Sequence, residues 1–197
     1  MADGRRQGVS RQPHDTGDRP TVGSAAAKPE ADPESVARNI GLRLLTAAPR
    51  SRRQLADAFE RRGVPSDVAE RVLDRFIEVG LLDDAEYARL VVHSQHVDRG
   101  LSGRALRFEL RKRGIDGELA EAAIGNLTDD DVEARARALL ARKLASMAGV
   151  DRDTRVRRAS GLLARKGYSP SLIARLVREM VDDGTLQDLT EAGSWDV

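Results

Sequence analysis

The chain has 197 residues, a formal net charge of +1 and no cysteine, which excludes disulfides and thiolate metal sites and fits a reducing cytosol. Hydrophobic residues at 40% suffice for a core, whereas aromatic residues at 3% argue against the base-stacking surface of single-strand-binding proteins. There is no apolar run of ~18 residues and no apolar region of a secretory signal at the N-terminus. We therefore expect a cytoplasmic protein without a membrane anchor.

Residues 1–32 are rich in Gly, Pro, Ser, Asp and Arg and contain almost no large apolar side chain. Such a segment cannot bury enough surface to offset the entropy of ordering, so we predict a disordered tail. Its five basic and five acidic residues cancel, which makes it a poor arm for binding nucleic acid.

Three helices are predicted after the tail. The first begins at Pro33 and ends before Pro49, because proline cannot continue a helix. The second covers residues 51–62 and the third covers residues 65–78, and each ends next to a glycine that can adopt the left-handed conformation.

The stretch 80–114 contains an acid-capped helix followed by a shorter basic helix. Asp83 can cap the first helix, Glu86 can reach back to close a capping box, and Gly100 can end it. The second helix is predicted to start near Ser102, a good N-cap, and to end at the glycine that closes the stretch.

This second helix is amphipathic. At about 100° per residue, Arg104, Arg107 and Arg111 fall within roughly 60° of one another, while Leu106 and Leu110 face the opposite side. Such a helix packs on its own protein through the leucines and presents its arginines to a partner.

A pattern of about fifty residues recurs three times when Gly63, Gly114 and Gly167 are aligned. Each repeat has too small a core to stand alone and must pack against its neighbours. The predicted fold class is therefore all-α, with three tandem three-helix repeats in an elongated, curved array. Apolar residues recur 4 before each glycine and 1, 5, 10 and 13 after it: Phe59, Leu110, Leu163; Val64, Ile115, Tyr168; Val68, Leu119, Leu172; Leu73, Ile124, Val177; Phe76, Leu127, Met180. The predicted divisions are the tail 1–32, repeat 1 at 33–82, repeat 2 at 83–127, repeat 3 at 128–183 and a C-terminal tail at 184–197.

Positive charge follows the same repeat. Arginine stands ten residues before each glycine, at Arg53, Arg104 and Arg157, in what we predict to be the first turn of a helix, where a cation is unfavourable. We therefore assign these arginines to a binding surface, a basic stripe made by the second helices of the repeats. The two residues before each glycine are also basic, and these pairs either offset the helix dipole or extend the stripe. The candidate filament- or DNA-binding residues are Arg53, Arg104, Arg107, Phe108, Arg111, Lys112, Arg113, Arg157, Arg158, Arg165 and Lys166.

Phe108 lies on the arginine side of its helix, and its equivalents in the other repeats are Asp57 and Gly161. The position is therefore not part of the repeated core. Two interpretations are open: a contact with the adjacent repeat, or an anchor that enters a partner protein or stacks on a base or an arginine.

Several motifs in the chain resemble the signature of the RecX family of bacterial recombinase regulators: Gly80-Leu81-Leu82-Asp83-Asp84, Tyr87-Ala88, Arg99-Gly100, Arg104, Glu109-Leu110 and Gly114-Ile115. The resemblance covers about residues 33–183 and departs from the family at His93, Ser94 and Gln95, where relatives tend to carry arginine. It implies a string of three-helix repeats that lies in the deep groove of the RecA filament on single-stranded DNA. It also implies inhibition of that filament's ATP hydrolysis, strand exchange and coprotease activity, with a role in DNA recombination, DNA repair and the SOS response.

Catalytic signals are weak. The chain has no phosphate-binding loop. His93 and His96 have no third metal ligand at a convincing spacing, and residues 129–131 are better explained as the acidic start of a helix after Thr128. We expect no enzyme activity, cofactor or metal.

Three functions remain open at this stage. The chain is a monomeric regulator that binds a nucleoprotein filament, with weak direct DNA binding, or a helical-repeat DNA-binding protein that acts without a recombinase partner. A scaffold for an unrelated filament or polymerase is the third. The near-neutral net charge favours the first, because a protein that relies on phosphate contacts alone is expected to be clearly basic.

Overall fold

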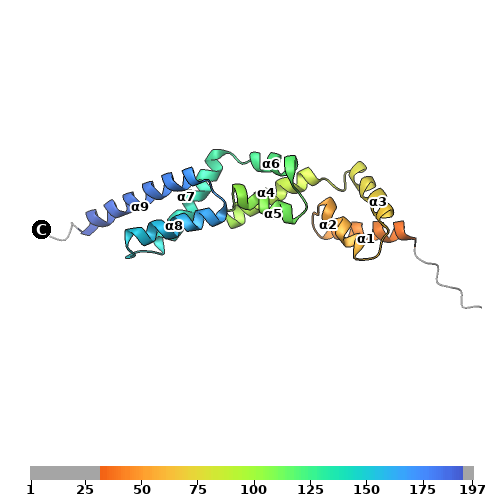
Figure 1. Ribbon diagram of the computed structural model, residues 1–197, viewed down its shortest axis with the longest axis horizontal. Coiled ribbons are helices and arrows are strands. Elements are labelled where there is room, and N and C mark those ends of the chain that lie inside the picture. The colour runs from red at the N-terminus through yellow and green to blue at the C-terminus, as the bar shows by residue number, and fades with distance from the viewer. Residues whose placement is uncertain (1–31, 193–197) are drawn as a thin grey trace, which may run out of the picture. The chain divides into compact units, whose positions relative to one another are not determined.

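The computed structural model describes residues 32–192, with side chains up to residue 181. Within that range the chain is all-α and has nine helices in three groups of three (Figure 1), which confirms the predicted fold class. The helices are α1 (Pro33–Ala47), α2 (Arg52–Glu60), α3 (Ser66–Glu78), α4 (Asp84–Arg99), α5 (Gly103–Lys112), α6 (Gly117–Gly125), α7 (Asp129–Ala145), α8 (Arg152–Lys166) and α9 (Pro170–Ala192).

The described part of the chain begins at the cap of α1 and ends with α9. Residues 1–31 of the predicted tail lie outside the described residues, whereas Asp32 caps α1 by accepting hydrogen bonds from the backbone N–H groups of Glu34 and Ser35. Helix α9 continues to Ala192, past residue 183, where the third repeat was expected to end. Among the described residues, none of the helices has the length and apolar character needed to cross a membrane.

Helix starts follow the capping residues in the sequence. Ser51 forms a capping box with Gln54 at the start of α2. Asp83 caps α4 as expected, but the carboxylate of Glu86 pairs with Arg89 at 2.6 Å instead of returning to the Asp83 backbone. The predicted capping box at α4 therefore does not form.

The acidic run after Thr128 starts a helix, as predicted. Thr128 and Asp131 form a capping box at the first turn of α7, and all three aspartates lie in that turn. The positive end of the helix dipole favours carboxylates there.

The three repeat glycines close the second helices in the same way. Gly63, Gly114 and Gly167 have φ values of 72°, 80° and 90°, a region that other residues rarely adopt. After each glycine the next residue donates its backbone N–H to the carbonyl five residues earlier, at 3.1, 3.0 and 3.2 Å, which is the bond of a Schellman turn. The apolar residue that accepts this bond is completely buried in every repeat, as Phe59, Leu110 and Leu163.

The predicted core was wrong at Leu119, whose side chain is 44% exposed. In α6 the buried positions belong to Ala120 and Ala123, which join the core of the second repeat with residues of α4 and α5. Small side chains allow α6 to approach α4 closely, so the leucine one position earlier turns outward.

Candidate functional site

The second helices of repeats 1 and 2 meet end to end. The hydroxyl of Ser51, at the start of α2, donates to the carbonyl of Arg113, at the end of α5, at 2.5 Å. Gly114 lies directly against the side chain of Arg53, and a Cβ atom at Gly114 would stand 2.7 Å from Cγ of that arginine. This position therefore requires glycine for space as well as for conformation.

The second helices of repeats 2 and 3 meet in an equivalent way. The backbone N–H of Ser102, before α5, donates to the carbonyl of Lys166, at the end of α8, at 2.9 Å. A Cβ atom at Gly167 would stand 2.5 Å from the backbone nitrogen of Ala105. Ser51 and Ser102 each precede their own repeat glycine by twelve residues, and both are buried.

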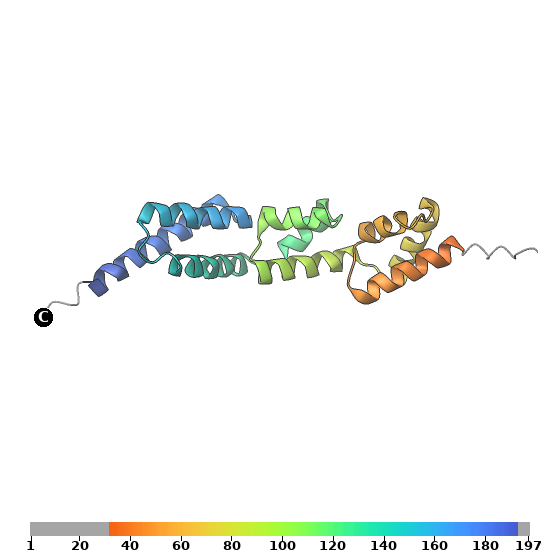
Figure 2. The same ribbon diagram turned by 90° about the horizontal axis from the view of Figure 1, so that it is seen from below.

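These two junctions place α8, α5 and α2 in one row that runs in a single N-to-C direction (Figure 2). We call it the second-helix row. Within it the C-terminal end of one helix dipole faces the N-terminal end of the next. Arg104 at the start of α5 therefore lies beside the negative end of α8, and Arg53 at the start of α2 lies beside the negative end of α5.

This geometry corrects the electrostatic argument from the sequence. A cation in the first turn was taken as unfavourable, but the neighbouring helix end compensates it. Arg157 does not lie in a first turn at all, because α8 begins five residues earlier, at Arg152. Arg53 and Arg104 thus have a structural explanation, and the binding role of the repeated arginines stays a prediction.

Arg107 is engaged within the protein. Its guanidinium forms a two-bond ion pair with the carboxylate of Glu121 on α6, with N–O distances of 2.5 and 2.8 Å. The same hydrogen bonds raise the pKa of Arg107 and lower the pKa of Glu121. Because both side chains are about half exposed, the pair neutralises charge on the surface more than it stabilises the fold.

Two further predicted residues are engaged in the same way. Arg113 forms an ion pair with Glu109 at 2.6 Å and also donates to the carbonyl of Glu109. The ammonium group of Lys166 donates to the carbonyl of Arg99 across the junction of repeats 2 and 3. These cations are fixed in place by contacts inside the protein.

The remaining predicted residues are exposed and form few bonds. Arg53 lies 4.0 Å from Asp57, and Arg157 donates to the hydroxyl of Thr154 at 3.2 Å. The side chains without a hydrogen bond or ion pair to other described residues are Arg104, Arg111, Lys112, Arg158 and Arg165. The second-helix row thus keeps a set of unpaired cations, although not the full arginine triplet expected on α5.

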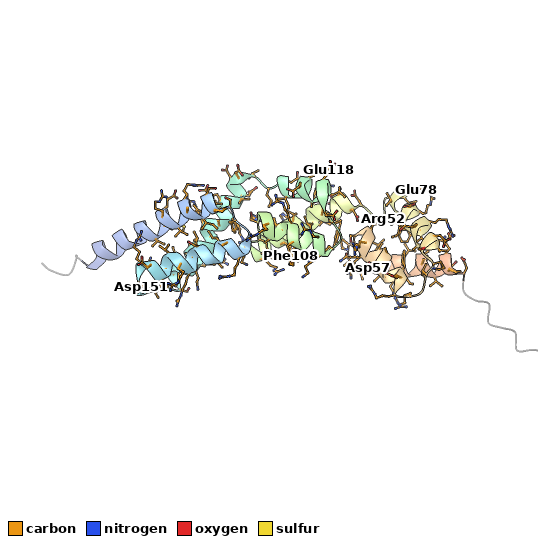
Figure 3. The ribbon with its side chains drawn as sticks, in the orientation of Figure 1. Arg52, Asp57, Glu78, Phe108, Glu118 and Asp151 are labelled. Carbon is orange, nitrogen blue, oxygen red and sulfur yellow. The ribbon has the colours of Figure 1, made fainter. Side chains whose placement is uncertain are left out.

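Phe108 is 59% exposed, the highest value among the exposed large hydrophobic side chains of the described chain. Figure 3 labels it on α5, at the edge of the helix that faces away from α6 in that view. The ammonium group of Lys112 lies over its ring, 5.7 Å from the ring centre. The ring is thus mostly exposed to solvent and is not packed in the core of a repeat.

The residues of the expected family motif mostly build the repeats and their junctions. The carboxylate of Asp84 accepts a hydrogen bond from the backbone N–H of Arg52 at 2.7 Å, which ties α4 to α2. Gly100 ends α4 in the left-handed conformation and lies against Leu139 of α7. The motif residues that are buried are Leu82, Tyr87, Ala88, Gly100, Leu110 and Ile115, whereas Leu81 is exposed.

Ser51 and Ser102 make the junction contacts, but from the sequence alone they were predicted only as helix starts. The signal was present, since the same residue type stands twelve positions before two of the three repeat glycines. A capping serine that is also buried indicates that its hydroxyl or amide has a second partner.

His93 and His96, the histidines of the described residues, do not belong to a group that could hold a metal ion. His96 is buried, and its Nδ1 atom shares a hydrogen bond with the carbonyl of Leu101 at 2.8 Å, whereas His93 is exposed. In the part of the chain that the structure describes, no three His, Cys, Asp or Glu side chains could together hold a metal ion.

Comparison with known proteins gives a consistent result. Residues 37–76, 83–124 and 129–177 match the first, second and third three-helix domains of RecX. Regulatory protein RecX of Thermobifida fusca is 52% identical over 165 residues, which covers 84% of this chain and 88% of the relative. Regulatory protein RecX of Streptomyces lividans is 48% identical, which covers 83% of this chain and 88% of the relative.

The fold agrees with a solved structure. The crystal structure of RecX from Lactobacillus salivarius superimposes with a TM-score of 0.71 at 22% sequence identity, covering 76% of this chain and 97% of that chain. With three matched domains and curated relatives that are about half identical, the chain belongs to the RecX family of regulatory proteins.

Proposed function

We propose that this chain binds the RecA filament on single-stranded DNA and inhibits its ATPase, strand-exchange and coprotease activities. Membership of the RecX family supports the choice of partner. The observation that carries the mechanism is the second-helix row, in which two equivalent junctions align α8, α5 and α2. A row of helices is suited to bind a filament because both repeat the same surface features at intervals along one direction.

The row offers charge in a form that fits such a partner. Arg104, Arg111, Arg158 and Arg165 are exposed and have no ion-pair partner among the described residues. Their guanidinium groups can bond phosphates and carboxylates with two parallel hydrogen bonds, so the row can bind both DNA backbone and acidic protein surface. In this proposal the chain acts as a cytoplasmic monomer, without a cofactor and without enzymatic activity of its own.

A pull-down with RecA, in the presence and absence of single-stranded DNA, tests the proposal. We expect capture of the chain by RecA that carries DNA and ATP, much weaker capture by RecA alone, and inhibition of the DNA-dependent ATPase. Equal capture on DNA with and without RecA would indicate a DNA-binding protein that acts without a recombinase. No capture by the filament would refute the proposed function.

The Arg104→Ala/Arg111→Ala double variant tests the row itself. The variant should stay folded, because unpaired exposed charges contribute little to stability. Filament inhibition should weaken by about an order of magnitude, the loss expected for two charge-assisted contacts. Arg43→Ala, which removes an exposed arginine of α1 outside the row, is the control and should inhibit normally.

A further inference from the structure

An open hollow of about 370 Å³ lies beside Phe108 at the junction of α5 and α8. Its volume falls at the lower end of the ~300–1,000 Å³ typical of small-molecule sites. Arg99, Arg104 and Arg165 line it from three different segments of the chain. The hollow therefore combines one exposed aromatic ring with three guanidinium groups.

The aromatic ring is not needed by the core. Of the three phenylalanines in the chain, Phe59 and Phe76 are buried in the first repeat, and only Phe108 is exposed. Lys112 lies over the ring, 5.7 Å from its centre, but is not one of the residues that line the hollow. Because Phe108 lines the hollow, a planar group that enters it can reach the ring.

The charge of the hollow is positive. Arg104 and Arg165 have no ion-pair partner among the described residues, and Arg99 lies 3.7 Å from Glu109. Glu109 is the only carboxylate that lines the hollow. It forms an ion pair with Arg113, whose hydrogen bond is the main cause of its lowered pKa, so its charge is already compensated.

We propose that this hollow holds one nucleotide of single-stranded DNA, with the base against Phe108 and the neighbouring phosphates on Arg104 and Arg165. Stacking on an aromatic side chain and guanidinium contacts to the backbone are the two ways in which single strands are held. One stacked base is compatible with a chain that is poor in aromatic residues, because a single site needs a single ring. The proposal rests on the proposed function only for the source of the strand, which is the filament.

A protein partner fits the hollow less well. A phenylalanine that anchors a protein interface inserts into a pocket of the partner and needs no hollow beside it on its own chain. Here the hollow and the ring belong to the same surface, which suits a ligand that enters and stacks. An acidic side chain would satisfy the arginines but would leave the face of the ring unused.

The test measures binding of the full-length chain to oligo(dT) and to a strand of equal length in which every base has been removed. Phe108→Ala should weaken binding to oligo(dT) by about tenfold or more, the effect of losing one stacked base. Phe108→Tyr keeps the ring and should bind within twofold of the unaltered chain. Leu119→Ala, which removes another exposed apolar side chain, from α6, is the control and should also bind normally.

The base-free strand separates stacking from other effects. On that strand the unaltered chain and Phe108→Ala should bind equally, because no base is left to stack. Arg104→Ala and Arg165→Ala should weaken binding to both strands, and each should reduce the slope of log affinity against log salt by about 0.7.

Two results would overturn the nucleotide site while leaving the proposed function in place. In the first, filament binding needs Phe108 but oligo(dT) binding does not, which would identify the ring as a protein anchor. In the second, Phe108→Ala weakens binding to the base-free strand as much as to oligo(dT). Absence of filament binding by the unaltered chain would instead refute the proposed function, whatever the oligonucleotides show.

Discussion

Gly167→Ala tests whether the junction of α8 and α5 depends on the close approach of two backbones. Gly167 combines a φ of 90° with direct contact to the neighbouring repeat, where a Cβ atom would meet the carbonyl oxygen of Ser102 and the nitrogen of Ala105. Gly63 has a φ of 72° and no atom within 4 Å of the position of a Cβ. Gly63→Ala is therefore a matched control that changes the backbone preference alone.

The magnitudes follow from the two contributions. An L-residue in the left-handed conformation costs roughly 1–2 kcal/mol, and both variants should lose this amount of stability. Only Gly167→Ala also places an atom against fixed backbone, which adds about 1–3 kcal/mol, as overpacked sites do. We expect Gly167→Ala to lower the free energy of unfolding by about 2–5 kcal/mol, and Gly63→Ala by no more than about 2.

Urea unfolding followed by circular dichroism measures the two variants, and hydrogen exchange reports on the junction directly. The amide of Ser102, which donates to Lys166, should exchange faster in Gly167→Ala than in Gly63→Ala. Filament inhibition should fall in parallel, because α5 and α8 no longer lie in one row. If the two variants unfold within about 0.5 kcal/mol of each other, the junction is not closely packed and this reasoning fails.

Three further predictions concern the core, the ion pairs and the pH dependence of stability. Leu110→Ala should cost about 2–5 kcal/mol in chemical unfolding because the side chain is completely buried, and a variant that unfolds like the parent would contradict that placement. Glu121→Gln should release Arg107 and strengthen filament inhibition severalfold in ATPase titrations, whereas unchanged inhibition would show that Arg107 takes no part in binding. The hydrogen bonds from Arg175 and Arg137 lower the pKa of Glu133 to about 2, from 4.5. The contacts of these side chains between α7 and α9 should therefore stabilise the fold fully above about pH 4.5, and this stabilisation should be lost as the pH falls toward 2. The unfolding midpoint of Glu133→Gln should not show this pH dependence.

The repeat could be predicted from sequence because its determinants are local. The left-handed glycine, the buried residue four positions before it and the turn that follows depend on short-range spacing, and they recur at Gly63, Gly114 and Gly167. The helix start after Thr128 was predicted because one side chain decides it, whereas the start of α8 after Asp151 was missed. The failure at Leu119 arose because the distance between α4 and α6 depends on packed alanines, which hydrophobic spacing alone does not reveal.

The candidate site was harder to predict because ion pairs depend on which elements become neighbours. Nothing in the spacing of Arg107 and Glu121, which lie on different helices, indicates that their side chains meet. The end-to-end order of α8, α5 and α2 was also not predicted, although it determines whether Arg104 at a helix start is unfavourable. Sequence patterns thus identified the basic helix correctly but could not separate its paired arginines from its unpaired ones.

Arg104 shows why the structural and the binding explanations of the repeated arginines are compatible. Its backbone belongs to the first turn of α5, where a cation is unfavourable, but it also lies next to the C-terminal end of α8, which offsets that effect. Its side chain is exposed and lines the hollow beside Phe108. The two helix ends tolerate any cation at this position, but only a guanidinium group can hold a phosphate with two hydrogen bonds. The junction therefore removes the penalty for a positive charge at this position, and in the proposed function the choice of arginine follows from phosphate binding.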